Sequence, residues 1–94
     1  MDINKIKQTI LPILKKNSIK RAGIFGSVAK GNDTDLSDID ILVELDKDMS
    51  LLDFVKIKLD LEDLLKQKVD LVEYKAIKSR LRERILAEEQ RIYG

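Results

Sequence analysis

The sequence contains no cysteine, histidine or tryptophan, and these absences exclude several kinds of active site. Without cysteine and histidine there is no Ser-His-Asp triad, no Cys-His pair and no zinc site built from these ligands. No disulfide can form, so nothing ties the chain to an oxidising compartment. The side chains left for chemistry are carboxylates, hydroxyls, lysines and arginines, and carboxylate oxygens suit hard ions such as magnesium.

The sequence also lacks an excess of charge of one sign and any long apolar run. Charged residues make up 37% of the sequence, yet the formal net charge is only +1, and there are only four aromatic residues to stack on bases. No apolar run reaches membrane-spanning length, and the first ten residues alternate polar and apolar positions too finely for a signal peptide. We therefore expect a cytoplasmic protein that binds neither nucleic acid directly nor a membrane.

The length of 94 residues suffices for one hydrophobic core, so we expect residues 1–94 to form a single domain. The apolar pattern predicts the order helix, strand, strand, helix, strand, helix, with a single helical turn after the first strand. These elements are expected at 3–14, 21–25, 39–45, 51–66, 68–74 and 77–90, with the turn at 27–31 closed by Gly31. Ser50 with Asp53 resembles a capping box at the start of the helix at 51–66, with Asp in place of the usual Glu or Gln.

The lengths of the connections predict how these strands pair. A short connection between the first two strands favours antiparallel pairing, whereas the helix between the second and third permits a parallel crossover. The expected fold class is α/β (α+β), with a small mixed three-stranded sheet and about four helices packed on it.

Two aspartates occupy unusual positions at the start of the strand predicted for 39–45. Asp is depleted in strands, yet Asp38 and Asp40 share one face while Ile39 and Ile41 share the other. Their Cα atoms lie about 7 Å apart in an extended chain. Two unpaired carboxylates at this range raise each other's pKa unless a cation lies between them. The pattern favours a divalent metal, although strand-end acids paired with lysine or solvated are the common alternative.

A third aspartate, Asp70, interrupts the apolar run VDLV, where it has no evident structural role. If this strand lies beside the strand at 39–45, Asp70 completes a cluster of three carboxylates. Such a cluster can hold two metal ions about 3.5–4 Å apart for a phosphoryl-type displacement.

Upstream of the acids, Gly26 and Ser27 open a tight turn directly after a strand. The backbone N–H groups of such a turn and the Ser27 hydroxyl are donors that suit a triphosphate. An ordinary turn is the simpler alternative for Gly-Ser. For Lys30, contact with a phosphate and simple solvation are both open.

The order Gly26-Ser27, ten residues, then Asp38-Ile39-Asp40, with a later strand aspartate, resembles the nucleotidyltransferase signature of the DNA polymerase beta superfamily. With its short length and the ending SRLRERILAEEQRIYG, the chain resembles the minimal nucleotidyltransferase (MNT) family. The resemblance implies the nucleotidyltransferase fold, in which Gly26 and Ser27 hold the phosphates of ATP.

The same resemblance implies the roles of the charged residues. Asp38 and Asp40 would bind two Mg²⁺ ions, and Asp70 would help to hold one of them and deprotonate the attacking hydroxyl. Lys30 stands where relatives often carry arginine, and it would balance the charge of the phosphate tail.

Members of this family are typically antitoxins encoded beside a HEPN-domain ribonuclease toxin, and some transfer AMP from ATP to a tyrosine of that toxin. The resemblance therefore implies a protein adenylyltransferase with a HEPN toxin as its partner. The alternative is a non-catalytic antitoxin that neutralises the toxin by complex formation, through its first or last helix. Because no further domain is predicted to grip a small acceptor, a partner brings the hydroxyl or a second copy of the chain completes the site.

Overall fold

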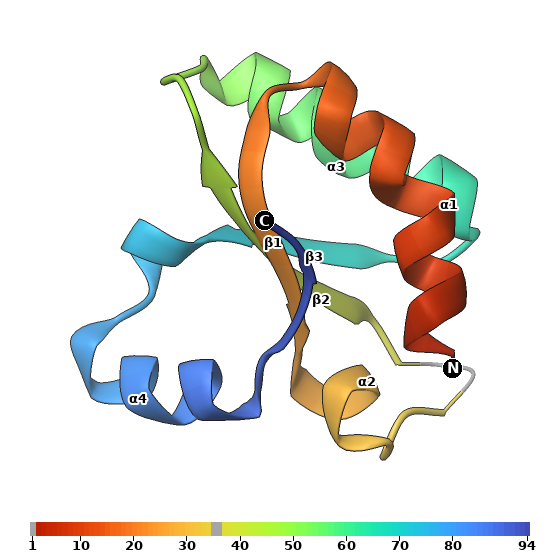
Figure 1. Cartoon of the computed structure of the whole chain (residues 1–94), viewed down its shortest axis with the longest axis vertical. Helices are drawn as coiled ribbons and strands as arrows, with labels where there is room; N and C mark the ends of the chain where they lie inside the picture. The colour runs from red at the N-terminus through yellow and green to blue at the C-terminus, as the bar shows by residue number, and fades with distance from the viewer. Residues whose placement is uncertain (1, 35–36) are drawn as a thin grey trace.

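The computed structural model describes residues 2–34 and 37–94 of the chain. Within these residues, α-helices and strands follow one another, and a short 3-10 helix comes after the third strand. The elements are α1 (Ile3–Lys16), β1 (Ile19–Phe25), α2 (Gly26–Lys30), β2 (Ile39–Leu45), α3 (Leu51–Leu65), β3 (Val69–Glu73), η1 (Tyr74–Ala76), α4 (Ser79–Glu88) and β4 (Gln90–Tyr93). Figure 1 shows α1 and α3 side by side on one side of the sheet and α4 on the other.

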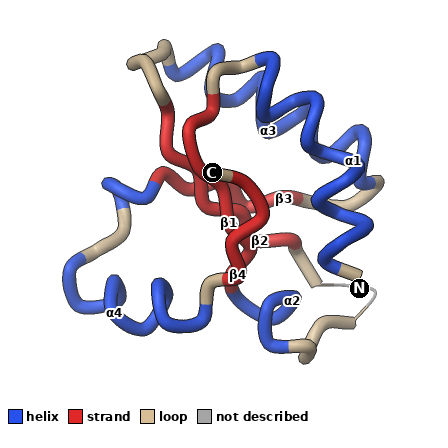
Figure 2. The backbone as a smooth tube through the Cα atoms, viewed as in Figure 1, coloured by secondary structure: helices blue, strands red, loops and turns tan. Residues whose placement is uncertain are grey.

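The sheet has the strand order β3-β2-β1-β4 and is mixed. Strand β1 pairs antiparallel with both β2 and β4, whereas β2 pairs parallel with β3. The predicted pairings of the first three strands are confirmed, because α3 provides the crossover that a parallel pair needs. In Figure 2 the strands form the centre of the molecule and the helices surround them.

The prediction of three strands is wrong, since the sheet has a fourth. The last helix ends at Glu88 instead of continuing to about residue 90, and Gln90–Tyr93 then pairs with β1 as an edge strand. Four residues are too few to show strand periodicity in the sequence. Their strand state depends on pairing with β1 and on burial of Ile92, which is only 3% exposed.

Strand β2 divides its residues between two cores. Ile39, Ile41 and Val43 face the main core under α1 and α3, and all three are fully buried. Leu42 faces the other side of the sheet, where it forms a smaller cluster with Tyr74 and Ile77 under α4. The side chains of this strand alternate between the two faces of the sheet as predicted, and apolar side chains are buried on both faces.

Helix α3 starts at a confirmed cap and carries an unusual outer face. The Ser50 hydroxyl accepts a hydrogen bond from the Asp53 backbone N–H at 3.2 Å, as the capping pattern predicted. The large apolar side chains that are exposed among the described residues all belong to this helix: Leu51 (77%), Leu52 (82%), Val55 (39%), Leu59 (55%) and Leu64 (46%). In the part of the chain that the structure describes, no helix is both long and apolar enough to span a membrane.

Candidate active site

Parallel pairing of β2 and β3 places two of the candidate aspartates next to each other. Asp40 lies opposite Asp70 in the strand register, directly beyond the Ile39 and Val69 pair. Asp40 is half-buried, while Asp70 and the preceding Asp38 are exposed. The predicted juxtaposition of Asp40 and Asp70 is confirmed, whereas the roles assigned to these residues stay predictions.

The surroundings of Asp40 disfavour the ionised form of its carboxyl group. Burial, together with the negative charges of Asp70 and Asp38, raises the pKa of Asp40 to about 6. None of the ion pairs among the described residues involves these three aspartates. Negative charge therefore accumulates at the start of β2, where no described lysine or arginine forms an ion pair with it.

The donor set at this position suits a hard divalent cation, because it consists of carboxylate oxygens on two adjacent strands. Within residues 2–34 and 37–94, no group of three or more acidic side chains is arranged as a set of metal ligands. The side chains of Asp38 and Asp70 are exposed, so each has room to change rotamer. The cluster thus fits such an ion in charge and chemistry.

Gly26 is required at the end of β1 for two reasons. Its backbone has a φ of 72°, which is costly for residues with a side chain. A Cβ at this position would also collide with the Oδ2 atom of Asp40, because Phe25 and Asp40 are partners in the antiparallel ladder. The turn predicted to hold phosphates therefore lies directly against the half-buried carboxylate.

Helix α2 contains the other two candidate residues at its two ends. Ser27 is half-buried in its first turn, and the Ser27 carbonyl accepts a hydrogen bond from the Asn32 N–H at 2.9 Å. Lys30 lies in the last turn, where its Nζ is 3.2 Å from the Glu88 Oε1 of α4. Gly31 closes the helix with a φ of 75°, as predicted. Lys30 is therefore engaged by a carboxylate, and phosphate binding by Ser27 and Lys30 stays a prediction.

The entry to β2 is fixed by contacts from the start of β3. The Ile39 N–H donates to the Lys68 carbonyl at 2.9 Å, and the Gln67 side chain donates to the Ser37 carbonyl at 3.1 Å. These bonds anchor the backbone on both sides of Asp38. Sequence reasoning missed Gln67, because no local pattern indicates which loop its side chain will reach. Asp35, in the loop ahead of the acids, lies outside the described residues.

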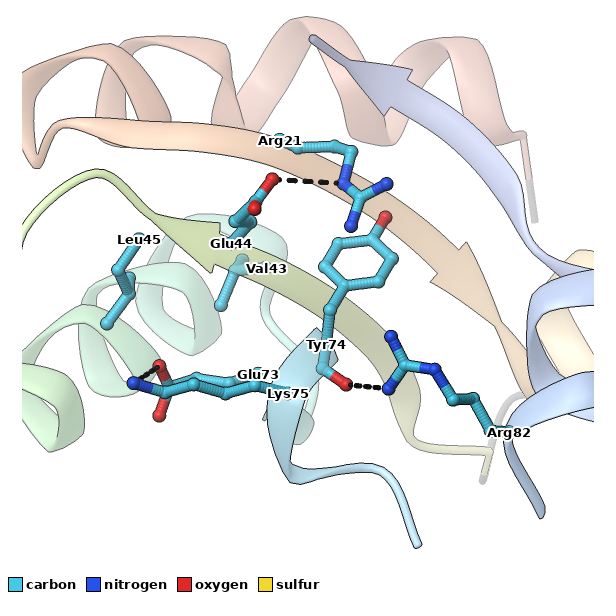
Figure 3. Close-up of a pocket in the computed structure, with 8 residues that line it drawn as sticks. All are labelled: Arg21, Val43, Glu44, Leu45, Glu73, Tyr74, Lys75 and Arg82. Atoms are coloured by element: carbon cyan, nitrogen blue, oxygen red, sulfur yellow. Dashed lines mark hydrogen bonds and ion pairs between the residues drawn. The ribbon is translucent and has the colours of Figure 1, made fainter. Parts of the chain in front are cut away.

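A cavity of about 210 Å³ lies at the other end of β2, near Glu44. In Figure 3 the Arg21 and Tyr74 side chains stack in its wall, with the guanidinium carbon 3.9 Å from the ring centroid. Arg21 Nε is 3.3 Å from Glu44 Oε1, and Arg82 donates to the Tyr74 carbonyl at 2.9 Å. Arg21 Nε has no hydrogen bond of good geometry, so its contact with Glu44 is purely an ion pair. Both arginines thus interact with protein groups.

Comparison with known proteins places the chain in a family. The model of the family described as Polymerase beta, Nucleotidyltransferase matches residues 8–94. A protein of Methanocaldococcus jannaschii, "Putative protein adenylyltransferase MJ0435", is 50% identical over 88 residues, which cover 94% of this chain and 95% of that protein. "Protein adenylyltransferase MntA" of Thermococcus cleftensis is 39% identical over 70 residues, covering 74% and 71% of the two chains.

Solved structures share the fold at lower sequence identity. "Crystal structure of the toxin-antitoxin with AMP-PNP" has a TM-score of 0.82 at 23% identity and covers 94% of this chain and 73% of that one. The MNT antitoxin complex with a tri-AMPylated HEPN toxin of Shewanella oneidensis has a TM-score of 0.76 at 20% identity, with 97% and 71% covered. At these identities the likeness shows the nucleotidyltransferase fold alone. The family match and the two sequence relatives show that the chain belongs to the Polymerase beta nucleotidyltransferase family, as an enzyme of its MNT branch, whose two members named above carry the name "Protein adenylyltransferase" or "Putative protein adenylyltransferase".

Proposed function

We propose that this chain is a magnesium-dependent protein adenylyltransferase that transfers AMP from ATP to a hydroxyl group of a HEPN-domain toxin. The proposed acceptor is the hydroxyl of a tyrosine. The observation that carries the proposal is the pairing of Asp40 with Asp70 beside Asp38, against the turn that begins at Gly26. Carboxylates next to a strand-to-helix turn are what transfer of a nucleotidyl group needs, because the turn offers donors to phosphates and the acids offer oxygens to cations.

The names of relatives support the choice of substrate and partner. Two relatives, at 50% and 39% identity, bear the name protein adenylyltransferase. One structure of the same fold contains AMP-PNP with a toxin-antitoxin pair, and another contains an AMPylated HEPN toxin bound to an MNT antitoxin. ATP as the AMP donor and a HEPN toxin as the acceptor are therefore the substrates that we assign.

In the proposed reaction, the hydroxyl oxygen of the acceptor attacks the α-phosphorus of ATP. The bond from that phosphorus to the bridging oxygen of the β-phosphate breaks, and diphosphate leaves. Asp70 takes the hydroxyl proton, since it is exposed at the edge of the acidic cluster. Gly26 and Ser27 orient the phosphates through backbone N–H groups and the Ser27 hydroxyl, so that the α-phosphorus faces the incoming oxygen.

Asp38, Asp40 and Asp70 are the residues that would hold Mg²⁺. When bound, Mg²⁺ would neutralise the carboxylates and stabilise the negative charge that develops on the transferred group. The raised pKa of Asp40 supports this assignment, because a cation between the carboxylates favours their ionised forms.

Transfer of label tests this proposal. The chain is incubated with Mg²⁺ and the HEPN protein encoded beside it, and with ATP labelled at either the α- or the γ-phosphate. We expect label to move to the partner from α-labelled ATP only. The change Asp40→Asn should abolish this transfer, whereas Asp63→Asn on the exposed side of α3 should not. Absence of transfer, or transfer of the γ-label, would contradict the proposal.

A second function, neutralisation by complex formation without catalysis, is favoured by the outer face of α3. Leu52 and Leu59 are 82% and 55% exposed, and side chains of this size exposed together commonly mark a protein contact. This function predicts that a chain carrying both Asp38→Asn and Asp40→Asn still protects against the toxin. Loss of protection in that double variant would reject it, provided that the variant remains folded.

A further inference from the structure

Helix α2, which begins at Gly26, is too short to be stable by itself. Helix α2 has five residues, and isolated helices below about 12 residues are marginal in water. Its end leaves backbone carbonyls without partners inside the helix. Contacts from elsewhere must therefore hold the turn in place. Val28 and Ala29 pack into the main core, and the junction between α4 and β4 adds polar contacts.

Two consecutive contacts join this junction to the end of α2. The Gln90 side-chain amide donates a hydrogen bond to the Ala29 carbonyl at 2.7 Å, across 61 positions of sequence. Glu88 receives the Lys30 ion pair at 3.2 Å. Gln90 is also the ladder partner of Ile24, so its backbone is fixed on β1 just before the turn begins.

The residue between them, Glu89, fixes the junction to the sheet. Its side chain is only 7% exposed, and its carboxylate accepts a hydrogen bond from the Tyr74 hydroxyl and lies 3.4 Å from Arg91 Nε. It occupies the space over Gly23, where a Cβ would collide with it. Because Glu89 is held by these groups, the neighbouring Gln90 is presented to α2 from a rigid support.

We propose that Glu88, Glu89 and Gln90 form a clamp that positions the turn Gly26–Lys30 for ATP, with Gln90 as the main positioning residue. This inference rests on the proposed function, which assigns the phosphates of ATP to that turn. Gly26 lies against Asp40, so a shift of α2 moves the phosphate donors relative to the carboxylates. A looser α2 would have to be ordered when ATP binds, and the free-energy cost of this ordering weakens binding of ATP.

The contacts of the clamp differ in strength. The Lys30 and Glu88 side chains are 45% and 29% exposed, and ion pairs of this kind contribute little. The bond from Gln90 satisfies a backbone carbonyl that the short helix leaves free, and it is partly buried. Removal of the Gln90 donor should therefore loosen α2 more than removal of the Glu88 charge.

Two variants separate the hydrogen bond from packing. Gln90→Glu keeps the shape of the side chain but replaces the donor with an acceptor facing the Ala29 carbonyl, and Gln90→Ala removes the side chain. Gln8→Ala on the exposed side of α1 is the matched control. Hydrogen exchange of the backbone amides of residues 26–32 reports the clamp without any substrate, and KM and kcat for ATP report its effect on the reaction.

We expect both Gln90 variants to exchange these amides about tenfold faster and to raise KM for ATP about tenfold, with kcat changed less than threefold. Gln8→Ala should change none of these quantities. Unchanged exchange in the Gln90 variants would overturn the clamp, as would faster exchange with an unchanged KM. If the unmodified chain transfers no AMP, the proposed function fails instead, and exchange of the amides still decides whether Gln90 holds the turn.

Discussion

The two faces of the sheet differ in what they contribute to the protein. The face under α1 and α3 is an apolar core that includes Ile39, Ile41 and Val43 of β2. The opposite face carries Asp40 and Glu44 on the same strand, with Leu42 between them in a smaller cluster. One strand thus supplies stability to one side and acids to the other, because successive side chains alternate.

Within β2, the residues on the core face stabilise the fold, whereas the acidic residues on the other face, which are proposed for catalysis, destabilise it. Burial of an isoleucine such as Ile41 contributes about 1.5–3 kcal/mol to folding. A half-buried carboxylate beside two others opposes folding, since its ionised form is favoured in water. Substitutions on adjacent residues of one strand should therefore have opposite effects.

The largest effect is expected for Asp40→Asn, on the acidic face. Loss of the carboxylate should lower the rate of AMP transfer about 10³-fold, because it removes a charge that acts on the transferred phosphate. The initial rate with saturating ATP measures this effect, with Asp63→Asn as the control of equal charge. A rate within tenfold of the unmodified chain would mean that Asp40 does not act on the reacting group.

The second effect is expected for Ile41→Ala, one position along the strand but on the core face. It should lower the free energy of unfolding by about 3 kcal/mol, because it removes a fully buried side chain and leaves a cavity. Urea denaturation measures this loss, and the rate of transfer per folded molecule should stay within threefold. A rate of transfer per folded molecule that falls as far as that of Asp40→Asn would contradict the view that the core face contributes stability and the acidic face catalysis.

The third effect is expected at Gly26, which begins the turn after β1 and lies against Asp40. Gly26→Ala should cost about 2 kcal/mol, from backbone strain at a φ of 72° and from collision with Asp40. Gly31→Ala is the control, since its φ is 75° but a Cβ there meets nothing within 4 Å. Chemical denaturation should show a larger loss for Gly26→Ala, and equal losses would mean that contact with Asp40 has no energetic weight.

The smallest effect is the dependence of stability on pH. The pKa of Asp40 is raised to about 6 in the folded chain, so between about pH 4 and 6 the folded state holds a proton that the unfolded state has lost. Stability contributed by this proton is therefore lost as pH rises through that window, by about 1 kcal/mol after allowance for solvent exposure.

Comparison with Asp40→Asn isolates this effect. Without divalent ions, the variant should match the unmodified chain near pH 4 and become more stable by about 1 kcal/mol above pH 6. Thermal denaturation across this range measures the difference. A difference that does not change with pH would show that Asp40 titrates at its ordinary value.

The sequence predicted those features that depend on local patterns. The bounds of β2, the Ser50 cap of α3 and the candidate acids follow from alternation, capping chemistry and spacing. The pairing of Asp40 with Asp70 was predicted on the condition that their strands are neighbours, and the crossover through α3 makes them so.

Features that depend on contacts between distant segments were missed. Strand β4 forms because β1 has a free edge, and Gln90 reaches Ala29 only because that strand pairs there. No pattern near Gln90 or Gln67 indicates these contacts. The positions of the candidate acids were therefore predictable, while the contacts that hold their surroundings were not.

The measurement that tests the central claim most directly is the intact mass of the proposed partner, the HEPN protein encoded beside this chain, after incubation with this chain, Mg²⁺ and ATP. We predict a mass increase of one or more AMP units, which is lost when the chain carries Asp38→Asn. An unshifted mass, or a shift that persists with Asp38→Asn, would contradict the assignment of the acidic face as a nucleotidyltransferase site.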